Sequence, residues 1–167
     1  MKGYNYVGLD VHKKVIAYCV KTADGTILGE GTIKATRKDL YCWADSLPKP
    51  WTGGMEATLF TGWIYDALLL YAAELKVGHS YKLKSFLAGK KKNDRLDASK
   101  LADALRCGLF PECHMAPAEI RDLRRVLRYR NFLVREAVRM KNKTAGLLME
   151  MGVEYNKQQL HGKRYFN

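Results

Sequence analysis

The sequence contains no long apolar run. Residues 64–73 come closest, but Asp66 interrupts this run and Glu74 follows it, so it is too short to span a bilayer. The N-terminus also lacks the apolar region of a signal peptide, and we therefore expect a cytosolic protein without a membrane partner. Cys-x-x-Cys pairs are absent too. The cysteines, at positions 19, 42, 107 and 113, are therefore expected to be reduced thiols rather than disulfides or zinc ligands.

Acidic residues are scarce relative to basic ones. The 167 residues include 29 Lys and Arg against 17 Asp and Glu, which gives a formal net charge of +12. An excess of this size favours a polyanionic partner, above all nucleic acid and less well an acidic membrane surface. Hydrophobic residues make up 47% of the chain, which is enough for a folded core and excludes a disordered protein.

The first part of the chain alternates between strand and helix patterns. Three strands are predicted at residues 4–11, 15–21 and 26–34, with Asp24-Gly25 as the turn of the second hairpin. A helix capped by Thr36, a strand at 51–57, a helix at about 59–74 and a strand at 76–81 follow. A meander followed by βαβ units predicts a mixed α/β fold.

The second part of the chain is helical and basic. Helices are predicted from Asp94 to about Cys107 and from Pro117 to about Met151. Between positions 121 and 143 the longer helix carries nine Lys or Arg against two acids, so we expect it to contact phosphates. The candidate nucleic-acid contacts of the whole chain are Lys13, Lys90, Lys91, Lys92, Arg95, Arg121, Arg124, Arg125, Arg128, Arg135, Arg139, Lys141 and Lys143.

Four acids stand at the ends of predicted elements. Asp10 and Glu56 each end a strand, and two further acids, Asp94 and Asp97, lie three residues apart on one face of a helix start. If the four converge, two Mg²⁺ or Mn²⁺ ions would relieve their repulsion and could clamp the oxygens of a phosphodiester. His12 is a further candidate as ligand or general base, although a histidine after a strand is also typical of an exposed polar group.

Each of these acids also has a purely structural interpretation. Asp94 and Asp97 fit a helix N-cap with an acid three residues on, which helix polarity favours by itself. Asp10 could open a turn, and Glu56 could pair with a lysine.

Three motifs together resemble those of a known family. Residues 8–13 (Gly-Leu-Asp-Val-His-Lys), 54–58 (Gly-Met-Glu-Ala-Thr) and 92–98 (Lys-Asn-Asp-Arg-Leu-Asp-Ala) resemble the DEDD-type transposases of insertion-sequence family one hundred and ten, bridge-RNA-guided recombinases. The resemblance implies a ribonuclease-H-like (RuvC-like) domain at residues 1–112 and a basic coiled-coil region at 113–167 that pairs protomers into a homodimer or larger oligomer. It also implies that the catalytic and metal-binding acids are Asp10, Glu56, Asp94 and Asp97.

The resemblance implies partners and a further domain as well. The expected partners are DNA and a guide (bridge) RNA, in the bacterial or archaeal cytosol near the nucleoid. Family members carry a C-terminal domain with a nucleophilic serine, and no serine of this sequence is placed for that role, so we expect the chain to be the N-terminal part of a longer recombinase. Two alternatives stay open: a nucleic-acid-binding and dimerisation module without catalysis, and an actin-like ATPase half-domain. The second lacks a glycine turn for ATP phosphates after Asp10.

Overall fold

The computed structural model describes residues 4–87, 93–160 and 162. The chain divides into two compact units, residues 1–115 and residues 116–167. The boundary predicted after residue 112 falls slightly earlier. Cys113 still belongs to the first unit, because its backbone N–H donates to the carbonyl oxygen of Val77 at 2.8 Å.

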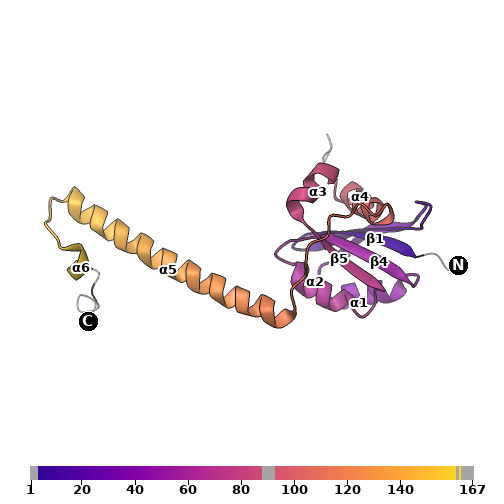
Figure 1. The fold of residues 1–167 in the computed structure, drawn as a ribbon, viewed down its shortest axis with the longest axis horizontal. Coiled ribbons are helices and arrows are strands. Elements are labelled where there is room, and N and C mark those ends of the chain that lie inside the picture. The colour runs from indigo at the N-terminus through magenta and orange to yellow at the C-terminus, as the bar shows by residue number, and fades with distance from the viewer. Residues whose placement is uncertain (1–3, 88–92, 161, 163–167) are drawn as a thin grey trace. The chain divides into compact units, whose positions relative to one another are not determined.

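A five-stranded mixed sheet forms the centre of the first unit (Figure 1). Its spatial order is β3 (Ile27–Lys34), β2 (Val15–Lys21), β1 (Asn5–Val11), β4 (Trp51–Glu56) and β5 (Glu74–Gly78). The first three strands form an antiparallel meander, whereas β4 and β5 run parallel to β1. This arrangement confirms the predicted mixed α/β fold and is consistent with a ribonuclease-H-like domain.

One face of the sheet is covered by α1 (Arg37–Ser46) and α2 (Thr61–Leu68) (Figure 1). Side chains alternate along each strand, and on this face β1, β2, β4 and β5 supply most of the large apolar ones. The main core therefore lies between this face and the two helices. Its fully buried members include Leu9, Leu40, Trp51, Met55, Ile64 and Leu68.

The opposite face carries small residues and is covered by α4 (Asp94–Arg106) (Figure 1). Ala17 and Cys19 of β2 pack there against Ala98 of the helix. A Cβ atom added to Gly8 of β1 would lie 2.0 Å from the carbonyl oxygen of Ala98 and 2.6 Å from the backbone nitrogen of Ala102. Only glycine therefore allows this close approach, and Gly8 sets how near α4 comes to β1.

Two local predictions are confirmed. The connection between β2 and β3 turns at Gly25, whose φ of 94° favours glycine, and the Asp24 carboxylate accepts from the backbone N–H of Thr26 at 3.2 Å. Thr36 caps α1, because its hydroxyl oxygen accepts from the backbone N–H of Asp39 at 3.2 Å. These short polar residues therefore fix the turn and the helix start.

Two predicted elements have different bounds in the structure. The second helix ends at Leu68 rather than near residue 74, because the N–H of Ala73 donates to the carbonyl oxygen of Trp51 at 2.9 Å and returns the chain to the sheet. The last strand therefore lies earlier than predicted, and its predicted end at residue 81 is wrong. The helix α3 (Ser80–Leu87), which the sequence analysis did not predict, follows it.

The second unit consists mainly of one long helix, α5 (Ala118–Glu150), followed by the short α6 (Lys157–Leu160). With 33 residues α5 is about 50 Å long. Within this helix Ala145 is the one buried residue, and most of the large apolar side chains are exposed. No helix in the described part of the chain is long and apolar enough to cross a membrane.

Candidate metal centre and nucleic-acid contacts

Asp10 lies near the end of β1 on the face of the sheet that α4 covers. Its neighbours Leu9 and Val11 belong to the main core on the other face, and side chains alternate along a strand. The Asp10 side chain is 17% exposed. The chain then turns sharply, with the N–H of His12 donating to the carbonyl oxygen of Val15 at 3.0 Å. This turn places the His12 imidazole beside the Asp10 carboxylate.

The start of α4 supplies two more acids. Asn93 caps this helix, because its side-chain oxygen accepts from the backbone N–H of Arg95 at 3.1 Å. The interpretation of Asp94 as the N-cap is therefore wrong, and Asp94 instead opens the first turn of the helix. Asp97 stands three residues further along, also near the helix start, and is buried. Helix polarity favours both acids at this end of the helix.

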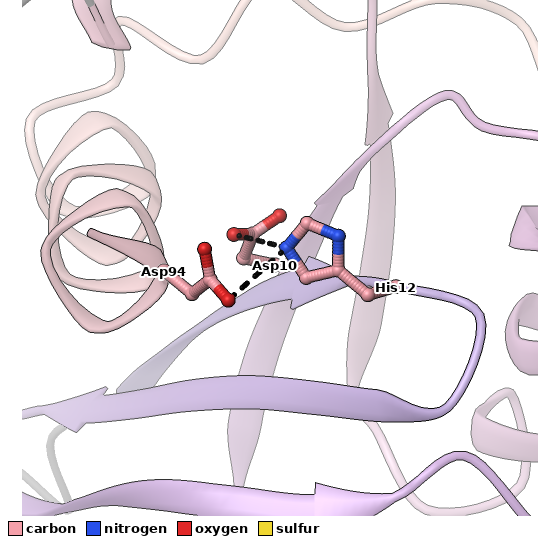
Figure 2. Close-up of side chains that lie close together, drawn as sticks. All are labelled: Asp10, His12 and Asp94. Carbon is pink, nitrogen blue, oxygen red and sulfur yellow. Dashed lines mark hydrogen bonds and ion pairs between the residues drawn. The ribbon is translucent and has the colours of Figure 1, made fainter. Parts of the chain in front are cut away.

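Asp10, His12 and Asp94 form a compact cluster (Figure 2). The Nε2 atom of His12 lies 3.1 Å from Oδ2 of Asp10 and 3.5 Å from Oδ2 of Asp94. One potential ligand atom from each residue lies within 4.8 Å of the other two. The imidazole thus bridges carboxylates from the first strand and from a helix more than eighty residues later in the chain. Among the described residues, no other group of three potential ligands lies this close together.

The Asp10 carboxylate is in an unfavourable environment for its charge. Burial raises the pKa of Asp10 above its ordinary value of 3.8, contact with His12 lowers it, and the charges of Asp94 and Asp97 raise it. A bound divalent cation would offset both the desolvation of the Asp10 carboxylate and the repulsion between the acids. Carboxylate oxygens suit Mg²⁺ and Mn²⁺, and an imidazole nitrogen suits Mn²⁺ better than Mg²⁺. The donor set of the cluster therefore fits an ion of this class.

The structure brings two of the four predicted acids into the cluster. Glu56 ends β4, and the parallel register that pairs Leu9 with Met55 places it beside Asp10 on the neighbouring strand. Neither Glu56 nor Asp97 belongs to the group whose ligand atoms lie within 4.8 Å of one another. Asp97 is nevertheless near enough for its charge to act on the pKa of Asp10. Glu56 and Asp97 thus lie next to the cluster but outside it.

His12 belongs to the cluster. The sequence leaves it open between a ligand and an exposed polar group, and the family resemblance implies only the four acids as ligands. The available signal was its position two residues after Asp10. Side chains two apart in a continuing strand would point the same way, whereas here the strand ends at Val11. The contact of His12 with Asp94 depends on the packing of α4, which no local pattern reveals.

Two predicted nucleic-acid contacts flank the cluster. Lys13 follows His12 in the turn after β1, and Arg95 follows Asp94 in the first turn of α4. Both side chains are exposed, so they are open to a phosphate backbone that approaches the acids. Lys90, Lys91 and Lys92 lie outside the described residues.

The other predicted contacts lie on α5. They are exposed, except for the half-buried Arg121: Arg121, Arg124, Arg125, Arg128, Arg135, Arg139, Lys141 and Lys143. Asp122 pairs with Arg125 at 2.9 Å and Glu136 pairs with Arg139 at 3.0 Å. These are the two acids between positions 121 and 143, so most of the positive charge of this stretch is not neutralised within the helix.

Comparison with known proteins identifies the family of the chain. The model of a DEDD transposase family, named for the insertion sequence IS110, matches residues 7–152. A search of curated proteins found no match. The family match covers most of the chain and includes most of β1, all of β4, the acids of α4 and the whole of α5. The chain therefore belongs to the IS110 family of DEDD transposases, which act on DNA in transposition.

Proposed function

We propose that this chain supplies the metal-dependent part of an RNA-guided DNA recombinase. The observation that carries the proposal is the cluster of Asp10, His12 and Asp94 beside the end of β1. In this proposal the cluster acids hold Mg²⁺ or Mn²⁺ together with Glu56 and Asp97. When bound, such ions stabilise charge on the oxygens exchanged at a phosphodiester.

The protein's own contribution is to hold these acids in fixed positions. A central strand fixes the position of Asp10, and the close packing against Gly8 fixes the position of α4. His12 contacts both Asp10 and Asp94, so it restrains the two carboxylates relative to one another. Ligands on rigid elements lose little conformational freedom when an ion binds, which raises affinity.

The basic residues of α5 fit the backbone of a nucleic acid. Contacts of Arg and Lys with phosphates give affinity but carry no sequence information. We therefore assign sequence choice to base pairing by a guide RNA, and the holding of RNA and DNA backbones to α5, Lys13 and Arg95. We propose the cytosol as the compartment in which the protein meets both nucleic acids.

The apolar residues of α5 support pairing between protomers. Leu123, Val126, Leu127, Leu133, Val134, Val138 and Met140 are all about half exposed or more. Exposed apolar surface of this extent is typical of an interaction site. Val126, Leu133 and Met140 recur every seven residues, and Leu127 and Val138 stand four residues after Leu123 and Val134. We therefore propose that α5 forms a coiled coil in a homodimer or larger oligomer.

Calorimetric titration with Mg²⁺ and Mn²⁺ tests the metal assignment. We expect the wild-type chain to bind both ions, Asp10→Ala to lose binding, and Asp45→Ala to bind as the wild type does. Asp45 is a matched control because it is an exposed acid on α1 that pairs with Lys49 at 3.5 Å. Absence of binding to the wild type, or equal binding to Asp10→Ala, would refute the proposal.

A non-catalytic binding module is the second candidate. It is favoured by the fact that two of the four predicted acids lie outside the cluster. Gel-shift and nuclease assays on the same DNA separate the two candidates. Binding that survives EDTA, with no cleavage at any metal concentration, would support the module, whereas metal-dependent cleavage that Asp10→Ala abolishes would support the enzyme.

A further inference from the structure

A cavity of about 240 Å³ adjoins the metal-binding cluster and has no role in the function proposed above. It is lined by His12, Lys13, Ala35, Arg37, Phe60 and Trp63. These residues come from the turn after β1, the start of α1 and the start of α2. His12 therefore belongs both to the wall of the cavity and to the acid cluster.

The lining of this cavity combines positive charge with flat aromatic surface. The guanidinium carbon of Arg37 lies 5.7 Å from the centre of the Trp63 ring, and Nη1 of Arg37 donates to the Tyr41 hydroxyl at 3.4 Å. Lys13 adds a second cation, and no acidic residue is among the described side chains that line the cavity. Aromatic rings and guanidinium planes are the surfaces on which unpaired bases stack, and the cations suit the attached phosphate.

The size of the cavity limits what can enter it. At about 240 Å³ it is smaller than the roughly 300–1,000 Å³ typical of sites for drug-sized ligands. It can take a single base but not a base pair. A nucleotide that enters must therefore be unpaired and must leave the stack of its helix.

We propose that this cavity, formed around Arg37 and Trp63, binds one unpaired nucleotide of the DNA strand whose phosphate lies at the acid cluster. The proposal rests on the function proposed above, because it assumes that the cluster acts on a phosphodiester. His12 would then lie between the acid cluster and the cavity, because its Nε2 atom contacts Asp10 and Asp94 and the residue also lines the cavity. The consequence is a preference for single-stranded or unwound DNA at the reacting position.

Tryptophan fluorescence of the full chain gives a readout specific to this cavity. Of the three tryptophans, Trp43 and Trp51 are buried, and Trp63 is half-buried at the cavity wall. We expect a short single-stranded oligodeoxynucleotide to quench the Trp63 emission, whereas a duplex of the same length leaves it unchanged. Trp63→Leu should abolish the quenching, and Trp63→Phe should retain the affinity because it keeps an aromatic surface.

A second variant separates the cavity from general charge effects. Arg37→Gln should weaken binding of the single-stranded oligonucleotide, measured by quenching of Trp63, roughly five- to hundredfold. This is the range for the loss of one base-stacking surface. Lys38→Gln is the matched control, because it removes an exposed neighbouring charge that does not line the cavity. An equal effect of the two variants would overturn the proposal.

Fluorescence anisotropy of a labelled oligonucleotide, measured in parallel, distinguishes failure of the cavity from failure of the proposed function. Binding without any change in Trp63 emission would overturn the cavity assignment and leave the recombinase function standing. Absence of binding to any nucleic acid would overturn both. Equal quenching by duplex DNA, or stronger quenching by an oligoribonucleotide of the same sequence, would also overturn the assignment to an unpaired DNA nucleotide.

Discussion

Substitution of Gly8 by alanine should disrupt the proposed metal site without changing any of its acids. A Cβ atom at this position would lie 2.0 Å from the carbonyl oxygen of Ala98, whereas ordinary contacts begin at 3.4 Å. Helix α4 must therefore move away from β1 by about 1.4 Å, because backbone atoms cannot rotate out of the way as a side chain can. Asp94 opens this helix and would move with it, away from Asp10 and His12.

The size of the effect follows from the geometry of the packing. Overpacking of a well-filled interior costs about 1–3 kcal/mol of stability. Displacement of a ligand by about 1 Å or loss of its orienting contact weakens a metal site roughly 10- to 100-fold. We therefore expect Gly8→Ala to lower the melting temperature and to weaken Mn²⁺ binding by at least about tenfold.

Calorimetric titration with Mn²⁺ and thermal unfolding, both on the full chain, measure the two effects. Gly29→Ala is the matched control, because an added Cβ at Gly29 of β3 meets no atom within 4 Å. This control should bind Mn²⁺ as the wild type does and should be equally stable or slightly more so. Wild-type Mn²⁺ affinity in Gly8→Ala would refute the argument that Gly8 positions the acids.

Other substitutions probe the cluster, the sheet and the long helix. The folded protein binds the Asp10 proton more tightly than the unfolded chain does, so wild-type stability falls as the pH rises from 3.8 through the raised pKa. Asp10→Asn should therefore have a higher Tm than the wild type at neutral pH in EDTA. The difference in Tm should disappear at low pH, and a difference that persists there would show that the charge of Asp10 is not its cause. Lys21→Met should lower the free energy of unfolding in urea by about 1–2 kcal/mol, because Lys21 is buried and its Nζ atom lies 2.6 Å from Oδ2 of Asp103. An unchanged urea midpoint would show that this ion pair does not stabilise the fold. Leu133→Glu should reduce the mass of the assembly measured by light scattering, and an unchanged mass would count against pairing through α5.

Much of the first unit could be predicted because its signals are local. Alternation of apolar residues indicates the strands of the meander, and Asp24-Gly25 indicates the hairpin turn. The end of α2 could not be predicted, because the apolar pattern continues past Leu68 and only the distant contact of Ala73 with Trp51 ends the helix.

The candidate site could also be predicted only where its signals are local. Acids at the ends of strands and helices stand out in the sequence, since a carboxylate that ends an apolar run is unusual. The spacing of Asp94 and Asp97 fits a helix cap at Asp94, but Asn93 is an equally good cap former, and the structure selects Asn93. The cavity around Trp63 could not be predicted, because its walls come from segments that only folding brings together.

The cluster joins the first strand of the protein to the last helix of its first unit. A ribosome that has completed the sheet has therefore still not delivered Asp94, and a partly synthesised chain holds Asp10 and His12 without their partner. The proposed ion-binding centre can form only after this helix has been synthesised and has packed against Gly8. A partly synthesised chain therefore lacks the complete set of ligands that the proposed metal site requires.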